Sequence, residues 1–244
     1  MHRSILLASV RSDLALIEAA LGDLTSPVPA CPGWDLGRLA RHLLGVHRMA
    51  TYAVTTGAPP PSGERPRWPG DADGLRTALT TSGEALVSLL QQTDPDRPAW
   101  SFLGTQPGAF WTRRMAHEHA IHRVDAQQAA GLAVDPVAPE QAADGIEEWL
   151  LIANERTLPR RDTPLDLGGG IHLRATDTDR AWTIRSEAGR LVATRGRSDS
   201  DASLRGTASD LLLGLWARTP LGAGTVERVG DDAVIAALAD IGGN

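Results

Sequence analysis

One stretch near the middle of the chain, Trp111 to Gln127, constrains the fold more than any other. It contains neither proline nor glycine, and Gly131 follows it as a stop signal, so the stretch predicts a helix. On a helix Glu118 and His122 share one face, because side chains four residues apart are neighbours there. Such a pair either binds a divalent metal or is an ordinary surface ion pair. A further ligand from another part of the chain would favour the metal.

A second helix, expected over residues 36–56, offers that ligand. Asp35 is suited to cap its start, and Gly57 is suited to end it. His42 borders the leucine-lined apolar face of this helix, whereas His47 is expected nearer its polar side. An inward-facing histidine is either a satisfied core residue or a ligand of a metal that two helices share.

Helical periodicity recurs in three other stretches, residues 4–21, 75–92 and 139–157. Residues 59–74 form a connection rich in proline and glycine, and residues 94–108 are expected to be a loop. Long helices joined by loops predict a bundle, and bundles build metal sites from side chains on facing helices.

From Pro159 the apolar period falls from about four residues to two, which indicates strands. We therefore expect an α-helical domain over residues 1–158 and a small α+β domain over residues 163–244. In the second domain the sequence predicts two helices and a set of short strands. The strands are expected at 165–167, 171–175, 181–186, 191–194, 202–205 and 226–229, and the helices at 209–217 and 233–240.

Composition excludes several kinds of function. All 24 basic residues are arginine, which excludes lysine Schiff-base chemistry and a P-loop lysine. The net charge of −6 and the absence of a basic run argue against nucleic-acid binding. Cys31 is the only cysteine, so neither an intrachain disulfide nor a cysteine-rich zinc site can form. No apolar stretch is long enough to cross a bilayer, and we expect a cytoplasmic protein without a membrane partner.

Together the two helices supply His42, Glu118 and His122 as candidate metal ligands. Two histidines and one carboxylate leave a coordination position open, which is the pattern of a catalytic zinc. Asp125, one turn beyond His122, is either an outer acceptor for the second nitrogen of that histidine or a helix-surface acid. His119 remains a rival ligand in place of Glu118.

Other side chains of the same helix have less certain roles. His117 is expected to face solvent. Arg113, Arg114 and Arg123 flank the candidate site, and they either bind substrate carboxylates or pair with the surplus of acidic residues. We select Arg114 as the candidate for contact with a bound cofactor, together with Asp125.

Three sequence motifs resemble the mycothiol-dependent maleylpyruvate isomerase family. They are CPGWDLGRLARHL at 31–43, FWTRRMAHEHAIHRVDA at 110–126 and SLRGTASDLLLGLWAR at 203–218. The resemblance covers nearly the whole chain and implies a DinB-like four-helix bundle followed by a small α+β domain similar to sterol-carrier folds. It also implies that a metal, usually zinc, is held by His42, Glu118 and His122.

The resemblance further implies that mycothiol is the thiol cofactor and that its sulfur occupies the open metal position. The cation would stabilise the thiolate, which attacks a small electrophilic substrate. The expected activity is cis–trans isomerisation or thiol S-transfer, in a monomer or small homo-oligomer. For an acidic substrate such as maleylpyruvate, Arg65, Arg67 and Arg76 are the first candidates for binding the carboxylate, and Arg205 is a rival.

Two other functions remain open at this point. One is a non-catalytic module that binds a metal or a thiol. The other is a DinB-like hydrolase that uses a metal-bound water and needs no thiol.

Overall fold

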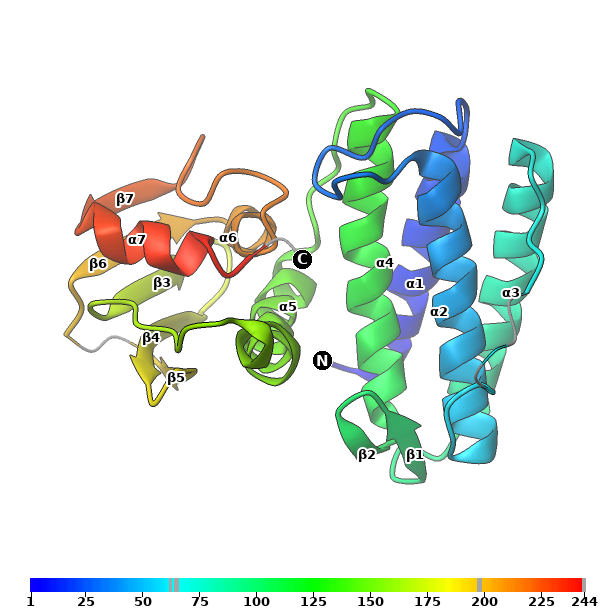
Figure 1. Ribbon diagram of the computed structural model, residues 1–244, viewed down its shortest axis with the longest axis horizontal. Helices are drawn as coiled ribbons and strands as arrows, with labels where there is room; N and C mark the ends of the chain where they lie inside the picture. Colours follow the sequence, from blue (N-terminus) through cyan, green and yellow to red (C-terminus); the bar gives the residue numbers. More distant parts are fainter. Residues whose placement is uncertain (62, 64–65, 197–198, 243–244) are drawn as a thin grey trace. The chain divides into compact units, whose positions relative to one another are not determined.

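The computed structural model describes the chain except for residues 62, 64–65, 197–198 and 243–244. It divides into two compact units, Met1–Asp135 and Pro136–Asn244. In the first unit four long helices run alongside one another (Figure 1) and form the bundle that the sequence predicts. These helices are α1 (Arg3–Ala20), α2 (Leu36–Thr56), α3 (Ala72–Gln92) and α4 (Ala109–Ala129).

The ends of α2 follow from local chemistry. The Asp35 side chain accepts a hydrogen bond from the backbone N–H of Arg38, which satisfies a donor left free in the first turn. Gly57 ends the helix at a φ of 71°, a left-handed conformation that glycine adopts without steric cost. Both ends of this helix therefore lie where the sequence predicts them.

Helix α4 is buried around most of its circumference, although it carries many polar residues. Trp111 and Met115 belong to one hydrophobic cluster and Ala126 to another, so the helix crosses most of the core. Buried polar side chains are costly unless they are hydrogen-bonded. The histidines, arginines and Asp125 of this helix therefore need partners from within the bundle.

The segment expected as a loop before α4 is a short hairpin instead. β1 (Pro98–Ser101) pairs antiparallel with β2 (Gly104–Pro107). Gly104 has a φ of 89°, and the Ser101 hydroxyl donates to its carbonyl, which closes the tight connection. The loop prediction was wrong because strands of four residues, each with a proline at one end, are too short to show an alternating pattern.

The second unit is a small α+β fold, as expected. Its sheet has the order β5-β4-β3-β6-β7, in which β3 and β6 are parallel and the other neighbours are antiparallel. The strands are β3 (Ile171–Ala175), β4 (Ala181–Glu187), β5 (Arg190–Arg195), β6 (Ala202–Gly206) and β7 (Glu227–Gly230). The helices are α5 (Pro139–Ile152), extended by irregular helical turns to Arg160, α6 (Ala208–Leu215) and α7 (Asp232–Ala239).

Two details of this unit differ from the expectations. The division between units falls after Asp135, whereas the expected domain boundary lies at 158–163. Helix α5 packs against α6 and so belongs to the second unit, and the period of a helix does not reveal which neighbours cover it. The strand expected at 165–167 is only an isolated bridge from Leu165 to Gly189.

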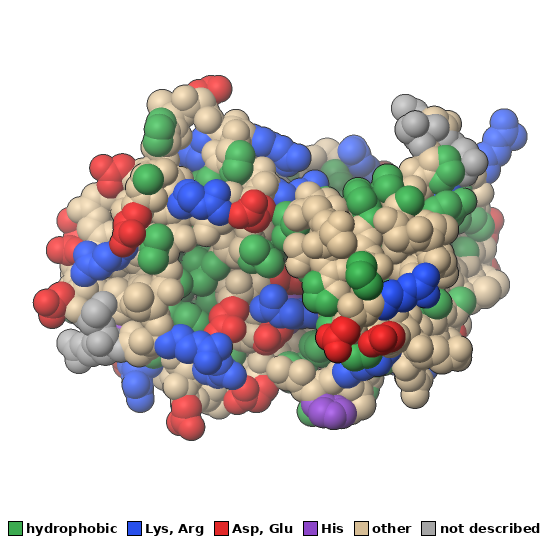
Figure 2. All heavy atoms as spheres, turned by 90° about the horizontal axis from the view of Figure 1, so that it is seen from below, with side chains coloured by type: hydrophobic (Ala, Val, Ile, Leu, Met, Phe, Trp, Pro, Cys, Tyr) green, Lys and Arg blue, Asp and Glu red, His purple; other side chains and the backbone are tan. Residues whose placement is uncertain are grey.

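None of the helices in the described part of the chain is both long and apolar enough to cross a bilayer. On the face shown in Figure 2, basic and acidic side chains are interleaved rather than gathered into one basic patch. This distribution fits the acidic net charge.

Candidate metal centre

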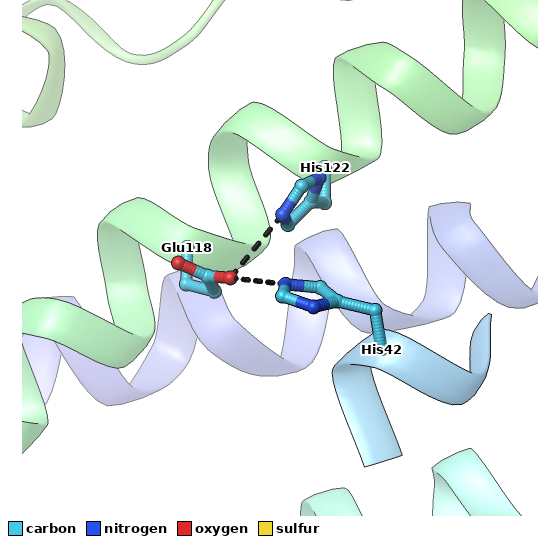
Figure 3. Close-up of side chains that lie close together, drawn as sticks. All are labelled: His42, Glu118 and His122. Atoms are coloured by element: carbon cyan, nitrogen blue, oxygen red, sulfur yellow. Dashed lines mark hydrogen bonds and ion pairs between the residues drawn. The ribbon is translucent and has the colours of Figure 1, made fainter. Parts of the chain in front are cut away.

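Three side chains from two helices meet inside the bundle. His42 extends from α2, and Glu118 and His122 extend from successive turns of α4 (Figure 3). The Glu118 Oε1 atom lies 2.8 Å from His42 Nε2 and 3.2 Å from His122 Nε2. One ligand atom from each residue lies within 4.8 Å of the other two. The structure thus brings together the three residues selected as metal ligands.

The spacing and the donor types suit a small divalent cation. Two ligand atoms on a tetrahedral zinc lie about 3.3 Å apart, given bonds of about 2.0–2.1 Å. The distances from Glu118 Oε1 to the two imidazole nitrogens are close to that value. Two imidazole nitrogens and one carboxylate oxygen match the donor set of zinc sites that keep a position for a further ligand.

Without a metal, the charges of Glu118 and His122 are stabilised by their neighbours. Burial raises the pKa of Glu118, but the Arg114 charge and the hydrogen bonds with His122 and His42 outweigh it, so the pKa lies well below 4.5. Burial also disfavours charge on His122, but its hydrogen bonds to Asp125 and Glu118 raise the pKa to about 9. The metal-free centre therefore holds an ionised Glu118 and a protonated His122 at neutral pH.

This protonation predicts how metal binding depends on pH. An entering cation must displace the proton of His122, whose pKa of about 9 exceeds neutral pH. The apparent zinc affinity should therefore rise by up to about tenfold per pH unit between pH 7 and 8.5, from the His122 proton alone. Competition titrations with a chelator of known zinc affinity measure this slope. A pH-independent affinity over that range would contradict a site in which the metal displaces a proton held on His122 with a pKa of about 9.

Asp125 supports the centre from behind His122. Its side chain is fully buried, and its Oδ2 accepts a hydrogen bond from His122 Nδ1 at 2.8 Å. The same oxygen lies 3.8 Å from the thiol of Cys31. This arrangement leaves His122 Nε2 directed at the ligand cluster. Asp125 thus acts on the centre through His122, and its burial argues against the predicted direct contact with a cofactor.

Removing this support should weaken metal binding without abolishing it. We expect Asp125→Ala to lower zinc affinity by about 10–100-fold, the usual effect of losing an outer partner of a ligating histidine. In Asp125→Asn the amide oxygen can still accept from the imidazole, so the loss should be smaller. Isothermal titration of both variants tests the order, and an Asp125→Ala affinity equal to that of the wild type would contradict it.

The four arginines selected from the sequence as substrate-binding or cofactor-binding residues do not share one location. Arg114 is buried and forms an ion pair with the Oε2 atom of Glu118. Arg76 donates to the backbone carbonyls of Glu18 and Leu21, and also pairs with Asp73. That placement ties the end of α1 to α3 and argues against substrate binding by Arg76. Arg67 is exposed in the connection before α3, where the described residues provide it with no ion pair, and Arg65 lies outside the described residues.

The rival ligand His119 faces away from the cluster. Its Nε2 lies 2.8 Å from Nε2 of His47, and its Nδ1 donates to the Met115 carbonyl. Burial lowers the pKa of His119 to about 4, so both its nitrogens are used by a neutral ring inside the core. His47 and His117 are buried as well, and the expectation that they face the polar side was wrong.

The sequence analysis did not single out two neighbours of this region. Gly83 of α3 leaves room for the Leu14 side chain of α1, with which an added Cβ would clash, and the His47 ring lies beside it. The Trp34 ring centroid is 4.9 Å from that of His42 and 6.2 Å from that of His122. Trp34 therefore forms a wall of the ligand cluster, and Arg38 stacks over the same indole. In the sequence, this role of Trp34 is indicated by its position directly before Asp35, the N-cap of α2.

Comparisons with known proteins agree with this architecture. Residues 7–127 match the family model of the mycothiol maleylpyruvate isomerase N-terminal domain, and residues 140–237 match that of the MDMPI C-terminal domain. No curated protein matches the chain. The crystal structure of a mycothiol-dependent maleylpyruvate isomerase is similar, with a TM-score of 0.59, 14% identity and 95% of each chain covered. The crystal structure of a histidine-to-alanine mutant of a mycothiol-dependent maleylpyruvate isomerase is also similar, with a TM-score of 0.58, 14% identity and 95% of each chain covered. At this identity, the structural likeness establishes a shared fold.

Proposed function

This chain belongs to the mycothiol maleylpyruvate isomerase family, and from that membership we propose that it is a mycothiol-dependent enzyme of the maleylpyruvate isomerase type. The N-terminal family model covers nearly all of the four-helix region, including the three residues of the ligand cluster. The substrate is then a small electrophile, and a carboxylate such as maleylpyruvate is the first candidate. A thiol cofactor must stay reduced to act, which supports a cytoplasmic location.

The proposal includes a divalent metal, most simply zinc, held by His42, Glu118 and His122. The observation that carries it is the convergence of three ligand atoms from two helices within 4.8 Å. A cation bound there would act as a Lewis acid that favours the thiolate form of a coordinated thiol at neutral pH. The three residues would supply one charged and two neutral donors, a set that would leave a four-coordinate cation one position for a sulfur ligand.

The surrounding side chains give the cluster its shape and charge. Trp34 contacts both imidazole rings and limits access from its side. Asp125 fixes the orientation of His122, as described above. Arg67, exposed in the connection between α2 and α3, remains our proposal for a residue that binds a substrate carboxylate, as does Arg65. An exposed arginine can swing onto a bound anion at little cost in lost contacts.

A thiol-plus-electrophile activity screen tests this function. The purified protein, loaded with one zinc per chain, is incubated with maleylpyruvate and with other electrophiles, with and without mycothiol. We expect turnover only when mycothiol is present. Recovery of the free thiol with a trans product indicates isomerisation, and consumption of the thiol indicates S-transfer.

Other outcomes of the same screen would contradict the proposal. Cleavage of esters or amides without any thiol would favour a metal-dependent hydrolase. Saturable mycothiol binding without turnover of any electrophile would favour a non-catalytic binding module.

A further inference from the structure

The two carboxylate oxygens of Glu118 face different partners. Oε1 lies at hydrogen-bond distance from both imidazoles of the cluster, 2.8 Å from His42 and 3.2 Å from His122. Oε2 accepts from the guanidinium of Arg114. The residue therefore presents one oxygen to the ligand cluster, while the other is already engaged.

Helix geometry and burial both stabilise the ion pair between Arg114 and Glu118. Arg114 precedes Glu118 by four residues on α4, so their side chains lie on the same face. The two side chains are 9% and 12% exposed, so water and salt screen the pair little. Breaking a buried ion pair by removing one partner is strongly unfavourable. Turning the Oε2 atom of Glu118 away from Arg114 would therefore be unfavourable.

We propose that Arg114 is a positioning residue that restricts Glu118 to binding the metal through a single oxygen. This inference rests on the proposed metal centre. It replaces the expectation that the Arg114 guanidinium contacts a bound cofactor. By holding Oε2, Arg114 prevents the carboxylate from occupying two coordination positions.

The restriction has a chemical consequence. A carboxylate that binds through both oxygens raises the coordination number, which suits larger and harder cations. A carboxylate limited to one oxygen leaves three protein donors, a low coordination number and room for one soft ligand such as sulfur. Arg114 would therefore favour zinc over manganese and would keep the vacancy open for a thiol.

Cobalt(II) substitution tests the inference, because its visible absorption is intense in four-coordinate sites and weak in five- or six-coordinate sites. We expect an intense spectrum for the wild type and a weaker one for Arg114→Met, in which Oε2 is released. Arg114→Lys keeps a positive charge but loses the planar guanidinium, so its spectrum should lie between those of the wild type and Arg114→Met. Arg113→Met is the matched control, since residue 113 lies about 100° around the helix from Arg114.

Metal preference provides a second readout. The ratio of the manganese dissociation constant to that of zinc should fall by about tenfold in Arg114→Met, on the scale of outer-partner mutations. The ratio is more informative than either affinity, because losing the positive charge of Arg114 changes the affinity for both cations alike. Arg113→Met should leave the ratio unchanged.

The outcomes separate this inference from the proposed function. If the wild type binds no cobalt, the metal centre itself is refuted. If it binds cobalt but Arg114→Met has the same intense spectrum and metal ratio, only the role of Arg114 is overturned. If Arg114→Met does not fold, the infrared difference spectrum between zinc-loaded and metal-free wild-type protein tests how Glu118 binds the metal. The bands of Glu118 are identified by their absence from the spectrum of Glu118→Gln. One-oxygen binding separates the two carboxylate stretching bands more widely than two-oxygen binding, and a narrow separation would overturn the inference.

Discussion

Glu118→Gln protein is expected to lose zinc affinity by more than about a hundredfold, because losing even an outer partner of a ligand costs 10–100-fold. The substitution removes the negative charge between His42 and His122 while keeping the size of the side chain. His42→Ala removes a ligand from the other helix and should have a comparable effect. Metal analysis after dialysis against a chelator measures both losses, and mycothiol-dependent turnover should fall with the bound metal.

His119→Gln is the matched control for this prediction. His119 is adjacent to Glu118 in sequence, but its nitrogens contact His47 and Met115 instead of the cluster. The folded fraction of this variant should keep one zinc per chain. Loss of zinc from His119→Gln together with retention in Glu118→Gln would establish the three-histidine alternative.

Asp13→Ala should lower the free energy of unfolding by about 3–5 kcal/mol, the cost of leaving one partner of a buried ion pair uncompensated. Arg123 of α4 donates to Asp13 of α1 at 3.2 Å, and their side chains are 3% and 11% exposed. Arg123 also donates to Gln127 and to the Asp135 carbonyl, so it cannot turn outward easily. Urea denaturation followed by circular dichroism measures the change.

The exposed ion pair between Arg11 and Glu84 supplies the comparison. It also joins α1 to a neighbouring helix, α3, but its side chains are 42% and 52% exposed. Glu84→Ala should therefore change the free energy of unfolding by no more than about 1 kcal/mol. Equal effects of the two substitutions would show that burial does not determine the strength of these pairs. The contacts of Arg123 with Asp13, Gln127 and Asp135 stabilise the bundle, so its guanidinium is unsuited to binding a substrate.

The metal ligands could be selected from sequence because each depends on a local rule. The four-residue spacing of Glu118 and His122 places them on one face of any helix. The Asp35 cap and the Gly57 stop define where α2 begins and ends, and His42 borders the side of this helix on which leucines are buried. The family resemblance selected the same three residues, and the structure places their ligand atoms together.

The remaining errors arose where long-range packing decides the outcome. His47 and His119 were not recognised as a buried pair, because their contact joins α2 to α4 and depends on how these two helices pack. Arg114 was selected as a binding residue, although its four-residue spacing from Glu118 already allows the ion pair that the structure shows. Arg76 was selected as well, but the backbone carbonyls that accept from it lie at the end of another helix, which no spacing rule brings to it in advance. Trp34 precedes α2 in a turn whose fold follows from backbone hydrogen bonds rather than from periodicity.

The most direct test of the metal centre is a crystal structure of the zinc-loaded protein with anomalous diffraction recorded on both sides of the zinc absorption edge. A single anomalous peak is expected within about 2.0–2.2 Å of His42 Nε2, Glu118 Oε1 and His122 Nε2. A zinc peak at other residues, or no peak between these three in protein that binds zinc in solution, would contradict the proposed centre.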